Sequence, residues 1–346
     1  MATQQTVDPK LAQSDIPRSL SDRPFAMRAL IQSQRFMLNK PLGGFGVFLI
    51  FLVVFGALFA DLIQRYDPET LFSQGNPKFD PEIAARAETD PNVKLQYPSE
   101  IWQKGDQPLR AEGPSSGHWL GTDTLGRDLY SRIVHGTRTA MTVGLGAAII
   151  AVLAGVLIGL ATAFFGGLVD FIGQRFVDTF QAFPPLIILL LFNQVVAEPN
   201  VWVNTISLGI VGIANIVRIV RSSVLAAREE VYVLAANTIG ASDARIMLRH
   251  ILPNIMAPII VIFTSSIGLY ILAEATLAFL GLGDPVRPSW GKMVEEGRRL
   301  GPAAPLMALF VGGALALAVL GFNLAGDALR DVLDPRLRGR GGRTGF

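Results

Sequence analysis

The chain has no cysteine and only three histidines among its 346 residues, and charged residues make up only 17% of it. The absence of cysteine excludes disulfides, thiol catalysis and thiolate metal sites. His118, His135 and His250 lie in separate regions without ligand spacing, so they give no support to a metal site. The sequence therefore predicts no cysteine chemistry and no bound metal.

Motifs for nucleotide binding and for hydrolysis are also missing. The phosphate cradle G-x-x-x-x-G-K-[ST] does not occur, because Gly291-Lys292 lacks both the following Ser or Thr and the upstream glycine spacing. Neither a G-x-S-x-G elbow nor an H-E-x-x-H helix is present. The net charge is only +2, which makes no case for nucleic acid as a partner. An intramembrane enzyme is therefore the weakest of the possible functional classes, and no motif for binding a nucleotide is present.

Long apolar runs are the main feature of the sequence, since half of its residues are hydrophobic. Runs of this length can cross a hydrocarbon core of about 30 Å, and they predict an all-α membrane protein. Gly155 and Gly159 give the second run a small-xxx-small face for close packing, and Pro184 and Pro185 predict a kink in the third. Six membrane-spanning helices are predicted, at residues 45–63, 142–165, 171–197, 202–220, 255–282 and 303–325.

The positions of Lys and Arg predict the orientation, because basic residues that flank spans stay in the cytoplasm. Six precede the first span, five lie from 218 to 249, and five close the chain from 330 to 343. We therefore expect cytoplasmic tails at 1–44 and 331–346, an external loop with an interfacial helix at 64–139, and a membrane domain of five helices at 140–330. The short external loop 282–302 departs from the rule, since it also carries four basic residues.

The stretch between the fourth and fifth spans, residues 229–254, is too long for a plain turn. It predicts two short helices separated at Gly240, with Ser242 or Asp243 as the cap of the second. The first helix places Tyr232, Ala235, Ala236 and Ile239 on one face, and the second places Ala244, Met247, Leu248 and Ile251 on one face, with Arg245 and Arg249 on another. Such a pair could dock on a soluble partner or rest on the lipid surface.

The same stretch resembles the EAA loop of ABC import permeases, whose pattern is Glu-Ala-Ala, three residues, Gly, nine residues, Ile, one residue, Leu-Pro. Ala235, Ala236, Gly240, Leu252 and Pro253 fall in register with that pattern. Two positions differ from it: Leu234 replaces the glutamate and His250 stands at the isoleucine. The histidine is usual in the dipeptide and oligopeptide branch of the family.

Further blocks resemble the second permease subunit of that branch. They are HWLGTDTLGRDLYSRIVHGTR from His118, AEATLAFLGLG from Ala273, PSWGKMV from Pro288 and FNLAGDALRDVLDPRLR from Phe322. The resemblance implies the type I ABC importer permease fold of six helices with a coupling loop, here 222–253, in a bacterial inner membrane. It implies as partners a homologous permease in a heterodimer, two ATP-binding subunits that hold ATP and Mg, an external solute-binding protein and the lipid bilayer. The solutes would be peptides or similar small molecules.

The resemblance also implies roles for particular residues. Docking on the ATPase would involve Ala235, Ala236, Gly240, Ala241, Ser242, Asp243, Arg245, Arg249, Leu252 and Pro253. Glu274, Asn204 and Asn215 are candidates for the translocation pathway, although Glu274 could instead pair with a neighbouring helix. An ion-gradient-driven secondary transporter is the alternative, and Glu274 would be its single coupling carboxylate.

Charged residues at the ends of spans have simpler expected roles. Asp123, Arg127 and Asp128 precede the second span, where capping and turn formation are expected. Asp331 follows Arg330 after the last span, where we expect a local ion pair.

Overall fold

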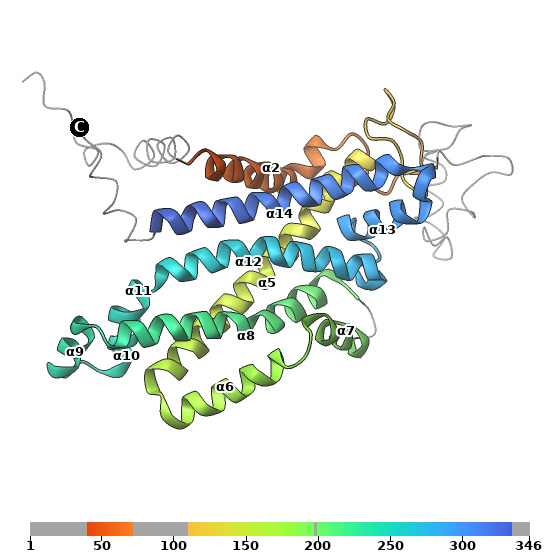
Figure 1. The fold of residues 1–346 in the computed structure, drawn as a ribbon. Helices are drawn as coiled ribbons and strands as arrows, with labels where there is room; N and C mark the ends of the chain where they lie inside the picture. Colours follow the sequence, from red (N-terminus) through yellow and green to blue (C-terminus); the bar gives the residue numbers. More distant parts are fainter. Residues whose placement is uncertain (1–39, 72–109, 197–198, 334–346) are drawn as a thin grey trace, which may run out of the picture.

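The computed structural model describes residues 40–71, 110–196 and 199–333. The expected tails and the middle of the expected external loop lie largely outside these residues. The longer helices are α2 (Pro41–Ile63), α5 (Leu129–Phe165), α6 (Gly167–Gln181), α7 (Pro185–Val195), α8 (Val201–Arg228), α12 (Met256–Leu277) and α14 (Pro305–Leu333). They pack together as one bundle (Figure 1). Only isolated β-bridges, and no strands, occur in this part of the chain, so the predicted all-α fold is confirmed.

Five helices of the described part are long and apolar enough to cross a membrane: α2, α5, α8, α12 extended to Leu282, and α14. A sixth span is possible if α6 and α7 count as one, although they are bent by 85° at the break between them. Pro184 and Pro185 form the N-terminus of α7 at this break, because neither has an N–H to continue the helix. The kink predicted at the two prolines is confirmed.

The bent pair carries the chain from one end of the bundle to the other (Figure 1). The end of α5 lies beside the end of α8, where the Arg228 guanidinium donates to the Ala163 carbonyl at 3.2 Å. The beginning of α8 lies at the opposite end, where the Val201 N–H donates to the Asp284 carboxylate at 3.3 Å. We call the end that holds residues 229–254 the segment end, and the opposite end, with residues 110–128 and 283–304, the cap end.

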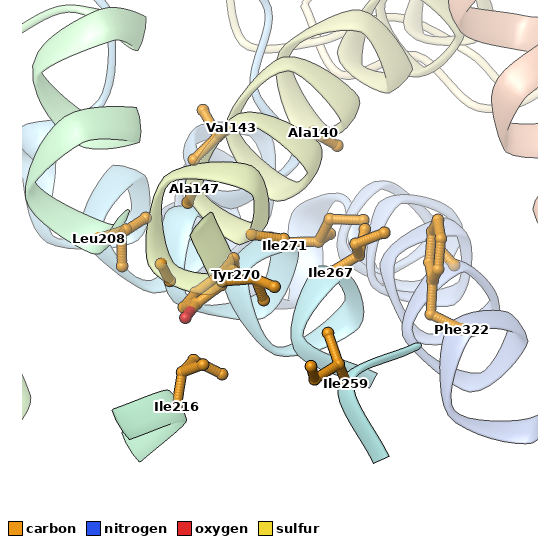
Figure 2. Packing of buried hydrophobic residues seen from close by; sticks show 14 of the residues in the cluster. Ala140, Val143, Ala147, Leu208, Ile216, Ile259, Ile267, Tyr270, Ile271 and Phe322 are labelled. Atoms are coloured by element: carbon orange, nitrogen blue, oxygen red, sulfur yellow. The ribbon is translucent and has the colours of Figure 1, made fainter. Parts of the chain in front are cut away.

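Small residues bring α5 and α8 into close contact. A Cβ on Gly155 would lie 2.5 Å from the Ile216 Cβ, and a Cβ on Gly159 would lie 3.0 Å from the Val220 Cβ. Contacts this close are available only to glycine, so the predicted small-xxx-small face is confirmed. Figure 2 shows the core beside this contact, where Tyr270 of α12 lies between α5 and Ile216 of α8.

The first and last spans are joined at the segment end. The Lys40 ammonium lies 2.7 Å from the Asp331 carboxylate, so α2 begins where α14 ends. Further along these two helices, Gly46 of α2 faces the backbone of Gly321 of α14. A Cβ on Gly46 would lie 2.9 Å from the Gly321 carbonyl oxygen. The expected local pairing of Asp331 with Arg330 is therefore replaced by a partner 291 positions away in sequence.

The second span begins earlier than its apolar run indicates. α5 starts at Leu129, with Asp128 as its N-cap, so the expected boundary between external loop and domain at 139/140 lies inside a helix. Two arginines in its first turns donate hydrogen bonds to carboxylates of an earlier segment. The Arg132 guanidinium donates to Glu69 at 2.9 Å, and the Arg138 guanidinium donates to Asp61 at 2.8 Å. Because these partners are distant in sequence, the apolar run alone could not locate the start of the helix.

Candidate functional site

Residues 229–254, here named the two-helix segment, project from the segment end of the bundle (Figure 1). The first helix is α9 (Val231–Thr238), and a turn at Gly240 with φ +76° follows it. The second comprises α10 (Asp243–Arg245), the π-helical turn η2 (Ile246–Ile251) and α11 (Leu252–Asn254). Glycine suits a positive φ because it has no Cβ, so the predicted turn at Gly240 is confirmed.

The segment is anchored in the core of the bundle. Val233 and Ala236 of α9 are buried, as are Ile246 and Ile251 of the second helix, and all four belong to the core cluster that runs through the bundle. Their burial is favourable by about 1.5–3 kcal/mol for each larger side chain. A force on the segment would therefore reach the spans through packed side chains.

The outer face of the segment is apolar and exposed. Val231, Leu234, Ile239 and Leu248 point away from the core, and Ile239 exposes 84% of its surface. A hollow of about 510 Å³ lies beside them, lined by Leu225, Arg228, Glu229 and Leu234. The sequence places Ile239 and Leu248 on the apolar faces of the two helices, but it gives no role to Val231, and Leu234 is named only as a departure from the motif.

The residues expected to dock on a partner all lie on this segment, but they differ in exposure. Seven are exposed: Ala235, Gly240, Ser242, Asp243, Arg245, Arg249 and Pro253. Ala241 and Leu252 are half-buried, whereas Ala236 is buried within the chain itself. Ser242 has an N-cap backbone conformation, but its side chain makes no capping hydrogen bond. Docking through these residues stays a prediction, and Ala236 could act only through its packing.

The two helices of the segment are also tied by polar contacts. The Ala241 N–H donates to the Ala236 carbonyl at 3.0 Å across the turn. Tyr232 has a side-chain hydrogen bond with Asn254, while burial, together with the Glu230 charge, raises the pKa of its phenol. The phenol therefore stays neutral at physiological pH and serves as a hydrogen-bonding tie.

The candidates for a translocation pathway do not form one cluster of contacts. Glu274 is buried and accepts a hydrogen bond from the Ser289 hydroxyl at 2.9 Å. Asn204 is buried too, and its amide donates to the Leu282 carbonyl at 2.9 Å. Asn215 is exposed on α8 and accepts from Gln181 at 3.3 Å. Glu274 and Asn204 thus hold the connection that leads from α12 to α13 (Trp290–Leu300).

A network of charges lies at the cap end, in which Asp123, Arg127 and Arg132 are buried and Glu69 is exposed. The Arg127 guanidinium donates to Asp123 at 2.7 Å and to Glu69 at 2.8 Å, and Arg132 donates to Glu69 at 2.9 Å. Asp123 also accepts from the backbone of its own turn, and Asp128 caps α5 by accepting from the Ser131 N–H at 2.9 Å. The expected capping and turn roles are confirmed. No cluster able to hold a metal ion occurs among the described residues.

Comparison with known proteins gives a family match. Residues 137–339 match the family described as binding-protein-dependent transport system inner membrane component. This match covers most of α5, all of the later helices and the two-helix segment.

Individual relatives are similar over most of their length. The chain is 41% identical over 230 residues to the dipeptide transport system permease protein DppC of Alkalihalophilus pseudofirmus, which covers 66% of this chain and 75% of that protein. It is 40% identical over 228 residues to the glutathione transport system permease protein GsiD of Pectobacterium atrosepticum, with the same coverage of 66% and 75%. It is 35% identical over 305 residues to the oligopeptide transport system permease protein OppC of Bacillus subtilis, with 88% of each chain covered.

Proposed function

We propose that this chain conducts peptides or similar small solutes across the bacterial inner membrane. It belongs to the family of binding-protein-dependent transport system inner membrane components and is a permease subunit of an ABC importer. As a multi-pass transport subunit it is not an enzyme, because ATP is hydrolysed on separate subunits. Its relatives are named as permeases for dipeptides, oligopeptides and glutathione, and these names support the proposed solute class. The comparisons do not favour the ion-gradient-driven transporter that the sequence left open.

The anchored two-helix segment is the observation that carries the proposed mechanism. Its inner face is part of the core through Val233, Ala236 and Ile246, while its outer face offers exposed apolar side chains. In the proposed complex an ATPase subunit covers the outer face, and closure of the ATPase pair displaces the segment. The buried face passes this displacement to α8 and α12, which switches the bundle between outward-open and inward-open states.

The proposed assembly contains partners beyond the ATPases. Membership of this family implies an external solute-binding protein as well as ATPase subunits. We further propose that the second half of the pathway comes from a homologous permease in a heterodimer, that two ATPase subunits are present, and that ATP and Mg²⁺ bind only to them.

We propose that the segment end is cytoplasmic. Arg245 and Arg249 lie exposed on the two-helix segment there, in line with the tendency of basic residues that flank spans to stay inside. At the cap end, by contrast, Arg127 and Arg132 are paired with carboxylates.

The proposed number of crossings is six. The ion pair between Lys40 and Asp331 places the start of α2 and the end of α14 at the same end, which requires an even number of crossings. Five long helices alone would give an odd number, so the bent pair of α6 and α7 supplies the sixth.

Reconstitution tests the proposed function. The chain is assembled with its sister permease and ATPases in proteoliposomes, and uptake of a labelled dipeptide is followed with loaded binding protein outside and ATP at the ATPases. We expect uptake only with ATP and all partners. Uptake by the purified chain alone under a proton gradient would refute the proposal.

Cysteine labelling tests the orientation, because the chain has no native cysteine. Ile239→Cys and Val286→Cys place single thiols at positions that are 84% and 77% exposed at the two ends. A membrane-impermeant maleimide should label the Val286→Cys variant in spheroplasts, and it should label the Ile239→Cys variant only in inverted vesicles from cells that lack the ATPase subunits, which would otherwise cover this position. The reverse pattern would overturn the proposed orientation.

A further inference from the structure

A polar cavity of about 590 Å³ lies at the cap end between the turn that ends α12 and the face of α13. Its volume is within the range of about 300–1,000 Å³ typical of sites for small ligands. Residues 278–285 form one wall, with Leu280 and Asp284 among them, and Lys292, Glu296 and Arg299 of α13 form another. None of the expected site residues lies among those that line it.

Most charges around this cavity are already used within the chain. Glu295 accepts hydrogen bonds from both Arg298 and Arg299. Asp284 accepts from the backbone N–H groups of Val286 at 2.9 Å and of Arg287 at 3.1 Å, which fixes the turn. These groups therefore shape the cavity and have little capacity left for a ligand.

Lys292 and Glu296 are the exceptions. The Lys292 ammonium donates only to the Pro285 carbonyl, at 3.1 Å, and no carboxylate pairs with it in the described part of the chain. The Glu296 carboxylate approaches the Arg127 guanidinium no closer than 3.8 Å, and its Oε2 has no hydrogen-bond partner among the described residues. The cavity thus presents one cation and one anion whose hydrogen-bonding capacity is incompletely used.

Both groups are partly removed from solvent, and the nearby Arg132 and Arg127 charges offset the burial of Glu296 only in part. Burial lowers the pKa of the Lys292 ammonium and raises the pKa of the Glu296 carboxyl group. A buried charge becomes favourable when an opposite charge and hydrogen bonds compensate it. A ligand that carried a carboxylate and an ammonium would supply both.

We propose that this cavity binds a short zwitterionic solute, with the ligand carboxylate at Lys292 and the ligand ammonium at Glu296. The inference rests on the proposed function and deepens it, because it assigns a solute site on this subunit at the external mouth of the bundle. Lys292 and Glu296 are four residues apart on α13, which places their Cβ atoms about 5–6 Å apart on one face. An extended dipeptide spans at most about 7 Å, so its two ends can reach both groups.

A single-cysteine experiment tests the site directly. Leu280→Cys places the only thiol of this chain in the cavity wall, at a position that is 49% exposed. The importer is assembled with its partners in nanodiscs, and an uncharged maleimide is used so that later changes of charge do not alter its approach. Labelling of this chain is followed by mass spectrometry, with and without millimolar dialanine.

We expect dialanine to slow the labelling by about threefold when its concentration is twice the dissociation constant. N-acetyl-dialanine amide, which has no charges, should give no protection. Adding Lys292→Met or Glu296→Gln should weaken binding of dialanine by about tenfold, because each removes one charge-assisted hydrogen bond, and should abolish the protection. Arg287→Gln, an exposed basic residue outside the cavity, is the matched control and should preserve it.

Three results would overturn the inference: equal protection by dialanine and its blocked analogue, protection that persists in both cavity variants, or a thiol that does not react in the assembled importer. Co-purification of the ATPases shows that the variants assemble. Dipeptide uptake is measured separately with the unmodified chain. Uptake without protection would remove the cavity site and leave the proposed function intact, whereas a lack of uptake of any peptide would remove the proposed solute class.

Discussion

The sharpest prediction concerns Val231, the first residue of α9, and its counterpart at the other end of the bundle. Val231 and Val286 are each 77% exposed, but Val231 lies on the two-helix segment and Val286 at the cap end. Replacing each by Asp makes the same chemical change at the two ends. Only the change at Val231 should weaken association with the ATPase subunits.

The magnitude follows from the surface that docking would cover. Full burial of a valine side chain is worth about 1.5–3 kcal/mol, so covering the exposed three-quarters of Val231 would contribute about 1–2 kcal/mol. Burying the new carboxylate adds a desolvation penalty. Since about 1.4 kcal/mol corresponds to a tenfold change in affinity, Val231→Asp should weaken association by at least about tenfold. The chain itself should not be destabilised, because an acidic residue in the first turn of a helix is favourable.

Binding of the ATPase subunits to the permease pair in nanodiscs is the assay, with Val286→Asp as the matched control. We expect normal unfolding temperatures for both variants and a loss of affinity for Val231→Asp alone. Unchanged affinity of the Val231→Asp variant would refute the assignment of this face as the docking surface. An equal loss in both variants would point to a general effect of added negative charge.

Three further changes probe the framework. Gly155→Ala should lower the free energy of unfolding by about 1–3 kcal/mol, because the new methyl group would overpack against α8. Gly312→Ala is the control and should leave this free energy unchanged, since no atom lies within 4 Å of its new Cβ; thermal unfolding in detergent compares the two variants. Gly240→Asn should retain ATP-driven uptake better than Gly240→Val, because Asn tolerates a positive φ and a β-branched residue does not; equal uptake would contradict this reason. Arg132→Met should cost about 1.5–3 kcal/mol, because it removes a buried guanidinium that lies 3.2 Å from the buried Asp123 carboxylate and 2.9 Å from Glu69. Arg138→Gln, in an exposed pair, should cost less than about 1 kcal/mol, and similar unfolding temperatures for the two variants would argue against a stabilising role of Arg132.

Features set by local chemistry could be predicted from the sequence. The two adjacent prolines break the third span wherever its neighbours lie, and Gly240 supplies a positive φ that few other residues adopt. The close contact of α5 and α8 was also predictable, because Gly155 and Gly159 share one face of a long apolar helix. Each of these features depends on residues within two turns of one another.

Features set by distant partners could not be predicted in this way. The start of α5 depends on Glu69 and Asp61, which compensate the arginines in its first turns. The inner face of α9 depends on its packing against Ile246 and the ends of the spans, so Val233 and Ala236 are buried, whereas Tyr232, Ala235 and Ile239 of the expected face are exposed. In both cases the deciding contact joins segments that the sequence pattern does not relate.

The two helices that flank the two-helix segment also flank the cavity, and this gives the proposed coupling a physical route. α8 ends and α12 begins within a few residues of the segment, and the two helices meet midway, where a Cβ on Gly212 would overlap the Tyr270 hydroxyl. At the cap end Asn204 of α8 is bonded to the Leu282 carbonyl, and Glu274 of α12 is bonded to Ser289 just before α13. Packed helices move as rigid bodies between discrete arrangements, so a displacement of the segment that tilts α8 against α12 would also move Pro199, which lines the cavity just before α8, relative to the residues at the end of α12. We expect this motion to change the surroundings of a solute bound at Lys292 and Glu296, so that the motion driven by the ATPases would also release it.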